Sequence, residues 1–191
     1  MHQEYAEQDR KILLKLAKDS IQYALSHHAM MDVTLDQLPE KLHETRASFV
    51  TLLMDHSLRG CIGSLIAYQP LALDVVKNAY SAAFSDPRFP AVSLQEVDRI
   101  EIHISVLSAL EPISFESEED LIRQLRPGVD GLVLTEQGMK GTFLPSVWES
   151  LPKPKNFLQH LKLKAGLPLN YWSNTITVER YTTESIEYEW T

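Results

Sequence analysis

The chain carries the sequence Leu-Arg-Gly-Cys-Ile-Gly-Ser-Leu at residues 58–65, and this stretch contains its single cysteine, Cys61. The segment before it, Ala47 to Met54, is rich in Phe, Val, Thr and Leu, which predicts a β-strand. Asp55-His56-Ser57 predicts a turn, so the chain returns through 58–65 as the second strand of a hairpin. Side chains two residues apart on a strand share a face, and we therefore expect Arg59 and Cys61 on one face.

Helical and strand patterns continue outward from this hairpin. Apolar residues recur every three or four positions over 4–29, and Pro70 begins a second helical pattern that ends near residue 85. Residues 100–107 alternate between apolar and polar side chains, which places Glu101 and His103 on one face of a strand. Further helices are expected over 118–125 and 155–165, and further strands over 131–135, 140–144, 175–180 and 186–190. Neither long blocks nor strict β–α alternation appears, so the order predicts an α+β fold.

Charge and composition exclude several broad classes. Acidic residues number 26 against 18 lysines and arginines, a formal net charge of −8, which disfavours nucleic-acid and membrane binding. One cysteine forms no intramolecular disulfide, which fits a reducing compartment. The first residues are polar, and no apolar run approaches the ~20 residues that span a bilayer. We expect a cytoplasmic protein.

The sequence lacks the motifs that usually indicate a bound cofactor. The sequence has no glycine-rich phosphate loop, no dinucleotide fingerprint, no metal-ligand spacing and no Gly-x-Ser-x-Gly elbow. We therefore expect no bound cofactor and no metal.

Four stretches read together resemble the AMMECR1 family, also described as protein A of the AmmeMemoRadiSam system. They are the motif at 58–63, the loop Asp86-Pro87-Arg88-Phe89-Pro90, the strand at 100–108, and Lys164-Ala165-Gly166-Leu167-Pro168. Gly141 to Pro145 resembles the family's glycine-to-proline strand end. The resemblance runs from about residue 10 to 180, and we expect one AMMECR1-type domain over 1–191, undivided or in two lobes.

This resemblance implies a fold and partners but no reaction. The implied fold is α+β, with a mainly antiparallel, barrel-like sheet, helices packed outside it and a smaller lobe beside a cleft. The implied partners are Memo-like and radical SAM proteins, whose genes often accompany this family in microbes. The family often has a second cysteine where this chain has Lys162, so no thiol partner for Cys61 comes from that position.

The sequence leaves two interpretations of Cys61 open, a nucleophile and a packed side chain. A thiolate is a strong nucleophile, and positive charge from Arg59 or Arg88 would favour that form. Alternatively, Gly60 and Gly63 allow close packing and Cys61 fills a tight space, as free cysteines commonly do. A Cys61–His103 dyad with Glu101 nearby is a further possibility that sequence alone does not decide.

The sequence also leaves two interpretations of Arg59 and Arg88 open, an anion-binding site and local ion pairs. Arg59 and Arg88 would suit one carboxylate or phosphate, because a planar guanidinium binds such groups with two hydrogen bonds. Alternatively each pairs with a local acid, Arg88 with Asp86 and Arg59 with Glu101. The candidate site therefore comprises the tentative catalytic residue Cys61 and the binding residues Arg59, Gly60, Asp86, Arg88 and Glu101.

Two functional hypotheses follow, and the sequence does not decide whether the protein is an enzyme. In the first, a cleft around the Arg-Gly-Cys-Ile-Gly motif binds a small anionic metabolite or a partner's peptide, with Cys61 available for chemistry. In the second, the protein is a non-enzymatic adaptor for Memo-like and radical SAM proteins. Nucleic-acid binding ranks last because of the acidic charge.

Overall fold

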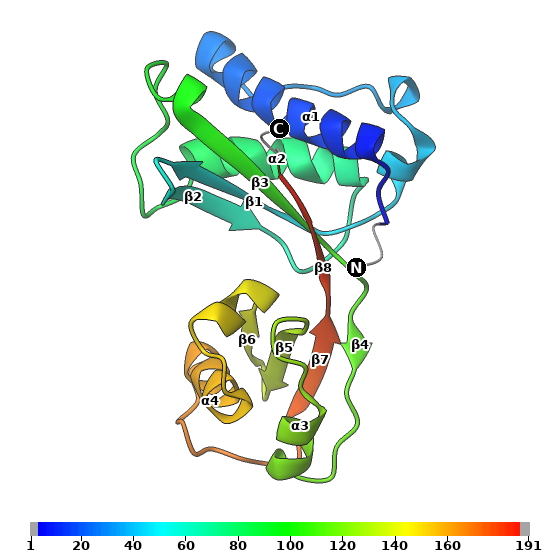
Figure 1. Ribbon diagram of the computed structural model, residues 1–191, viewed down its shortest axis with the longest axis vertical. Coiled ribbons are helices and arrows are strands. Elements are labelled where there is room, and N and C mark those ends of the chain that lie inside the picture. Colours follow the sequence, from blue (N-terminus) through cyan, green and yellow to red (C-terminus); the bar gives the residue numbers. More distant parts are fainter. Residues whose placement is uncertain (1–3, 188–191) are drawn as a thin grey trace. The chain divides into compact units, whose positions relative to one another are not determined.

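A computed structural model describes residues 4–187, and the chain divides into two compact units (Figure 1). The first unit comprises residues 1–107 and 184–191, and the second comprises residues 108–183. Each has its own four-stranded sheet and its own hydrophobic core.

The sheet of the first unit has the strand order β2-β1-β3-β8. Its strands are β1 (Ser48–Met54), β2 (Ser57–Gly63), β3 (Ile100–Leu107) and β8 (Thr183–Ile186). β1 runs antiparallel to both β2 and β3, so the predicted hairpin is confirmed. In this register Thr51 of β1 lies opposite Cys61 on one side and opposite His103 on the other.

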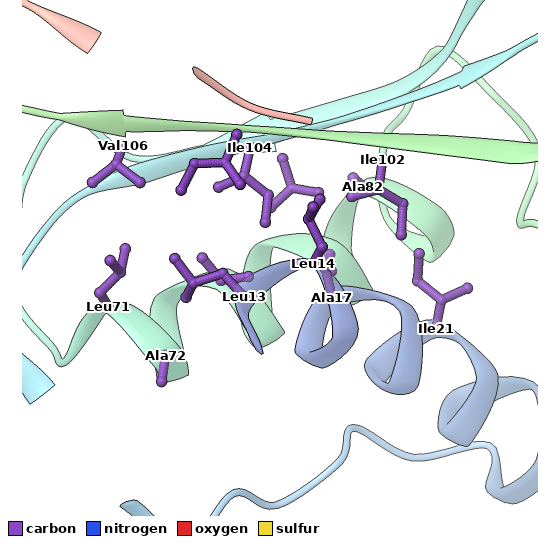
Figure 2. Packing of buried hydrophobic residues seen from close by; sticks show 14 of the residues in the cluster. Leu13, Leu14, Ala17, Ile21, Leu71, Ala72, Ala82, Ile102, Ile104 and Val106 are labelled. Atoms are coloured by element: carbon purple, nitrogen blue, oxygen red, sulfur yellow. The ribbon is translucent and has the colours of Figure 1, made fainter. Parts of the chain in front are cut away.

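Two helices, α1 (Glu7–His27) and α2 (Leu71–Phe84), pack against one face of this sheet. Figure 2 shows Leu13, Leu14, Ala17 and Ile21 of α1 pointing toward the sheet, where they meet Ile102, Ile104 and Val106 of β3. The spacing of three and four residues puts these side chains on one stripe of the helix, which explains why the helical period was readable in the sequence.

Gly60 lies where α2 comes closest to β2. A Cβ added to Gly60 would stand 2.2 Å from the carbonyl oxygen of Ala82, a distance that no real side chain tolerates. The buried face of α2 is rich in alanine, which lets its backbone approach the strand. The glycine before Cys61 is therefore required by packing.

The second unit has the strand order β4-β7-β5-β6. Its strands are β4 (Glu111–Pro112), β5 (Gly131–Glu136), β6 (Met139–Phe143) and β7 (Thr177–Tyr181), accompanied by α3 (Glu118–Gln124) and α4 (Pro154–Lys164). Trp148 and Phe157 stack with ring centroids 3.7 Å apart in the core of this unit. Lys162 of α4 is fully buried, with its ammonium on Glu118 and 5.5 Å from the ring centre of Trp172.

Short 3-10 helices occupy several connections between these elements. They are η1 (Leu35–Gln37), η2 (Glu40–His43), η3 (Val97–Arg99) and η4 (Pro145–Glu149).

The α+β prediction is confirmed, but the expected barrel-like sheet is wrong. The described strands form two separate open sheets, because β5, β6 and β7 pair with one another and with β4, not with the strands of the first unit. The single domain expected over 1–191 and the cleft beside a smaller lobe stay predictions. Most of the strand expected over 186–190 lies outside the described residues; the described strand β8 ends at Ile186.

Candidate functional site

The candidate site lies on the far face of the first sheet, by which we mean the face away from α1 and α2. Val50, Leu52, Ile102 and Ile104 point into the helix-covered core, so the residues between them point to the far face. The far face therefore carries one row of side chains, Cys61 from β2, Thr51 from β1 and His103 from β3. All three are partly exposed.

Cys61 is held by hydrogen bonds at both its side chain and its backbone. The Thr51 hydroxyl donates to the Cys61 sulfur across 3.2 Å. The Cys61 backbone N–H donates to Asp86 Oδ2 across 2.9 Å. The thiol is therefore neither sealed in the core nor free to move, and it sits beside a hydroxyl and a carboxylate-bearing loop.

Arg88 and Asp86 form the local pair that one reading of the sequence foresaw. Arg88 Nε donates to Asp86 Oδ1 across 2.9 Å, and Arg88 Nη2 donates to Oδ2 across 2.7 Å. Arg88 Nη2 also donates to the Cys61 carbonyl oxygen across 3.2 Å. The pair thus ties the loop at 86–90 to the strand that carries the cysteine.

Asp86 and Arg88 differ sharply in exposure. The Asp86 side chain is 2% exposed, whereas that of Arg88 is 54% exposed. Hydrogen bonds from Arg88, and then from the backbone N–H groups of Cys61 and Arg88, hold the pKa of Asp86 well below its usual range despite burial. The buried carboxylate thereby fixes the guanidinium of a side chain that is more than half exposed. Within the described chain, Arg88 Nη1 has no hydrogen-bond partner.

Arg59 does not join Arg88 at an anion site. Its guanidinium is buried and donates to both carboxylate oxygens of Glu96, at 2.9 and 3.2 Å, and to the carbonyl oxygens of Pro90 and Ala91. The alternative in which Arg59 pairs with Glu101 is wrong, because the loop after Pro90 folds back over β2 and brings Glu96 to the arginine. Arg59 therefore holds this loop in place.

Glu96 is the residue that the sequence interpretation missed. The Arg59 guanidinium, followed by the Ser93 backbone N–H, lowers the pKa of Glu96 to about 2. The Ser93 hydroxyl also donates to Glu96 across 2.9 Å. The available signal was the Ser-x-x-Glu spacing at 93–96, which often marks such reciprocal bonds.

Glu101 and His103 lie on the far face but not as expected. Glu101 lies opposite Leu53, one step closer to the hairpin turn than the Cys61 row. His103 Nδ1 lies 3.3 Å from Glu187 Oε2, so its carboxylate neighbour is Glu187 rather than Glu101. Thr51 separates His103 from Cys61, and two strand spacings amount to about 10 Å. The described contacts therefore contain no Cys61–His103 hydrogen bond.

Two further features concern metal binding and membrane insertion. In the part of the chain from 4 to 187, no group of three His, Cys, Asp or Glu side chains is arranged to hold a metal ion. Over the same residues, no helix is both long and apolar enough to cross a membrane.

Comparison with known proteins then decides the family. The AMMECR1 family model matches residues 14–186, nearly the whole chain. The chain belongs to the AMMECR1 family. The resemblance seen in the sequence is thus confirmed, over a range close to the expected 10–180.

Relatives of this AMMECR1 chain share its length as well as its sequence. A protein from Thermotoga maritima is 40% identical over 152 residues, covering 78% of this chain and 82% of the relative. One from Methanothermobacter thermautotrophicus is 37% identical over 163 residues, covering 83% and 82%. The crystal structure of the uncharacterised protein PH0010 from Pyrococcus horikoshii matches with a TM-score of 0.86 at 32% identity, covering 94% of this chain and 91% of that one. None of these names states an activity.

Proposed function

We propose that the far face of the first sheet binds a small anionic ligand, with a carboxylate or phosphate, beside the thiol of Cys61. Arg88 is the anion-binding residue in this proposal, and Cys61 is the residue available for chemistry on the bound ligand. Asp86 and Thr51 position these two groups. Arg59 and Gly60 act indirectly. Arg59 holds the loop at 90–96, and Gly60 allows α2 to pack closely against β2.

One observation carries the proposal. The Arg88 guanidinium is anchored on two sides, by Asp86 and by the Cys61 carbonyl, yet its side chain is 54% exposed and its Nη1 has no hydrogen-bond partner among the described residues. A guanidinium that is held in one orientation loses little entropy when it binds an anion. The same anchoring keeps the charge next to the thiol, where it would favour an anionic reactant.

The acidic composition of the chain supports a local rather than a general attraction for anions. With a net charge of −8, the protein as a whole repels anions, and any that bind must do so at a particular cationic group. Arg88 is such a group, because most of its side chain stays in solvent although it is paired.

The test is retention of metabolites by the purified protein. Wild type, Arg88→Gln and the control Arg123→Gln, an exposed arginine of α3, are each equilibrated with a cell metabolite extract, and bound compounds are identified by mass spectrometry. We expect an anionic compound that wild type and Arg123→Gln retain and Arg88→Gln loses. Equal retention by Arg88→Gln, or no enrichment on wild type, would contradict the proposal.

The adaptor role stays a prediction of the family resemblance. Co-purification of the native chain with Memo-like or radical SAM proteins is the measurement that checks it. A partner's peptide as the anionic ligand, and a cytoplasmic location, stay predictions in the same sense.

A further inference from the structure

A cavity of about 480 Å³ opens in the first unit, beside the start of β3 and the β1–β2 turn. Cys61, Asp86 and Arg88 do not line it, whereas Glu101 and His103 of the far face do. Its volume falls in the range of about 300–1,000 Å³ that is typical of small-molecule sites. Its apolar lining residues are Ile100 and Ile102.

Charged side chains without a partner gather at this cavity. Lys18 of α1, Asp98 and Glu101 line it, and none of the three has a hydrogen bond or an ion pair to another side chain of the described residues. By contrast, Arg99 and Asp55, which also line it, are paired with each other. The cavity thus offers one free cation and two free carboxylates among its described lining.

The hairpin turn places another polar group at the cavity. Asp55 and His56 have φ angles of 51° and 61°, the left-handed pair that a two-residue hairpin turn needs. Glycine and asparagine adopt this conformation more readily than histidine. The turn nevertheless holds His56 against the cavity, where it too has no partner among the described residues.

We propose that this cavity binds a small ligand of basic amino-acid type, with one carboxylate and two cationic groups. The carboxylate pairs with Lys18, and the cationic groups pair with Asp98 and Glu101. The aliphatic part of the ligand lies on Ile100 and Ile102. These charges complement the free charges of the cavity one for one, and each charge-assisted hydrogen bond favours this ligand over a neutral or acidic one.

The experiment is calorimetric titration of the full chain with L-lysine and L-arginine, with L-leucine and L-glutamate as comparison probes. We expect binding of a basic amino acid at least fivefold tighter than that of L-leucine, and no binding of L-glutamate. Glu101→Gln and Lys18→Met should each weaken that binding at least about fivefold, as expected when a charged hydrogen-bond partner is lost. Glu119→Gln, an exposed acid of α3 outside the cavity, is the matched control and should change nothing.

Three results would overturn the proposal. They are no binding of either basic amino acid at millimolar concentration, equal binding of L-leucine, and binding that both cavity variants leave intact. A circular-dichroism spectrum and an unfolding midpoint measured for each variant identify any that fail to fold. Because both cavity substitutions are at solvent-accessible side chains, we expect both variants to fold.

Discussion

The hydroxyl of Thr51 donates a hydrogen bond to the sulfur of Cys61, 3.2 Å away across the β1–β2 ladder. A threonine on the interior strand β1 therefore contacts the cysteine of the edge strand β2 directly. Its other cross-strand neighbour is His103. Thr51 is thus the residue that joins the thiol to the rest of the far face.

Replacing Thr51 by valine tests this relationship. Valine keeps the β-branched shape that suits a strand but removes the hydroxyl donor. We expect iodoacetamide to alkylate Cys61 about two- to fivefold more slowly in Thr51→Val, since a thiolate loses a hydrogen bond worth roughly 0.5–1 kcal/mol. Thr142→Val, which removes a hydroxyl of β6 bonded to the Leu132 carbonyl, is the control and should leave the rate unchanged. An unchanged or faster rate in Thr51→Val would argue against the role given to Thr51.

Asp86→Ala should destabilise the protein. The buried carboxylate accepts hydrogen bonds from the Arg88 side chain and from the backbone N–H groups of Cys61 and Arg88. Its removal leaves the Cys61 N–H without its acceptor, and we expect a loss of about 2–3 kcal/mol in the free energy of unfolding. Urea denaturation measures this, with the exposed Asp36→Ala as a control expected within about 0.5 kcal/mol of wild type. Equal stabilities of the two variants would show that the loop at 86–90 is held by something else.

The Arg59–Glu96 pair predicts a specific dependence of stability on pH. The pKa of Glu96 falls from 4.5 to about 2 in the folded protein, because the Arg59 guanidinium favours the carboxylate. The stabilisation is therefore fully present above about pH 4.5 and is lost as the pH falls toward 2. Asp86, whose pKa is also lowered, acts with the same sign.

Glu96→Gln should accordingly be less stable than wild type at pH 7. Its free energy of unfolding should also fall less steeply between pH 4.5 and 2, because one carboxylate that resists protonation is gone. Urea denaturation at half-unit pH intervals gives both quantities. Parallel curves for the two proteins across that range would contradict the account of Glu96.

Gly60→Ala tests the contact between β2 and α2. The added Cβ would stand 2.2 Å from the Ala82 carbonyl oxygen, so the helix or the strand must shift. We expect a loss of about 2–4 kcal/mol, or no folding, as for an overpacked core. Gly128→Ala has open space around its Cβ but a φ of +76°, so it should cost only about 1–2 kcal/mol. A Gly60→Ala protein as stable as wild type would show that α2 does not need this close approach.

Local patterns in the sequence predicted the local structure well. The helical period predicted α1 and α2 because each buries one stripe against one sheet face. Strict alternation predicted β3 and the face that carries Glu101 and His103. The Arg88–Asp86 pair was foreseeable because its members are two residues apart.

Long-range relationships were not predictable from the same patterns. Arg59 pairs with Glu96 although the two residues lie 37 positions apart in the chain, with α2 between them, and no local spacing encodes such a contact. His103 lies beside Glu187 because β8, near the C-terminal end of the chain, is the neighbour of β3 in the sheet. Closure of the sheets into a barrel likewise depends on pairing between distant strands, and here the strands pair within two separate sheets. The two-residue strand β4 is too short to produce any alternation.

The central claim is that Arg88 attracts anions to the Cys61 thiol. It can be tested directly with two alkylating reagents that differ in charge. Iodoacetate is anionic and iodoacetamide is neutral, and the single cysteine makes the modification specific. The ratio of the two rates, divided by the same ratio for N-acetylcysteine, reports the local attraction for anions. We predict a normalised ratio above one in wild type and in Arg123→Gln, falling about three- to tenfold in Arg88→Gln, as expected for the loss of one charge that is hydrogen-bonded to the Cys61 backbone. A wild-type ratio at or below one, or a ratio that Arg88→Gln leaves unchanged, would contradict the claim.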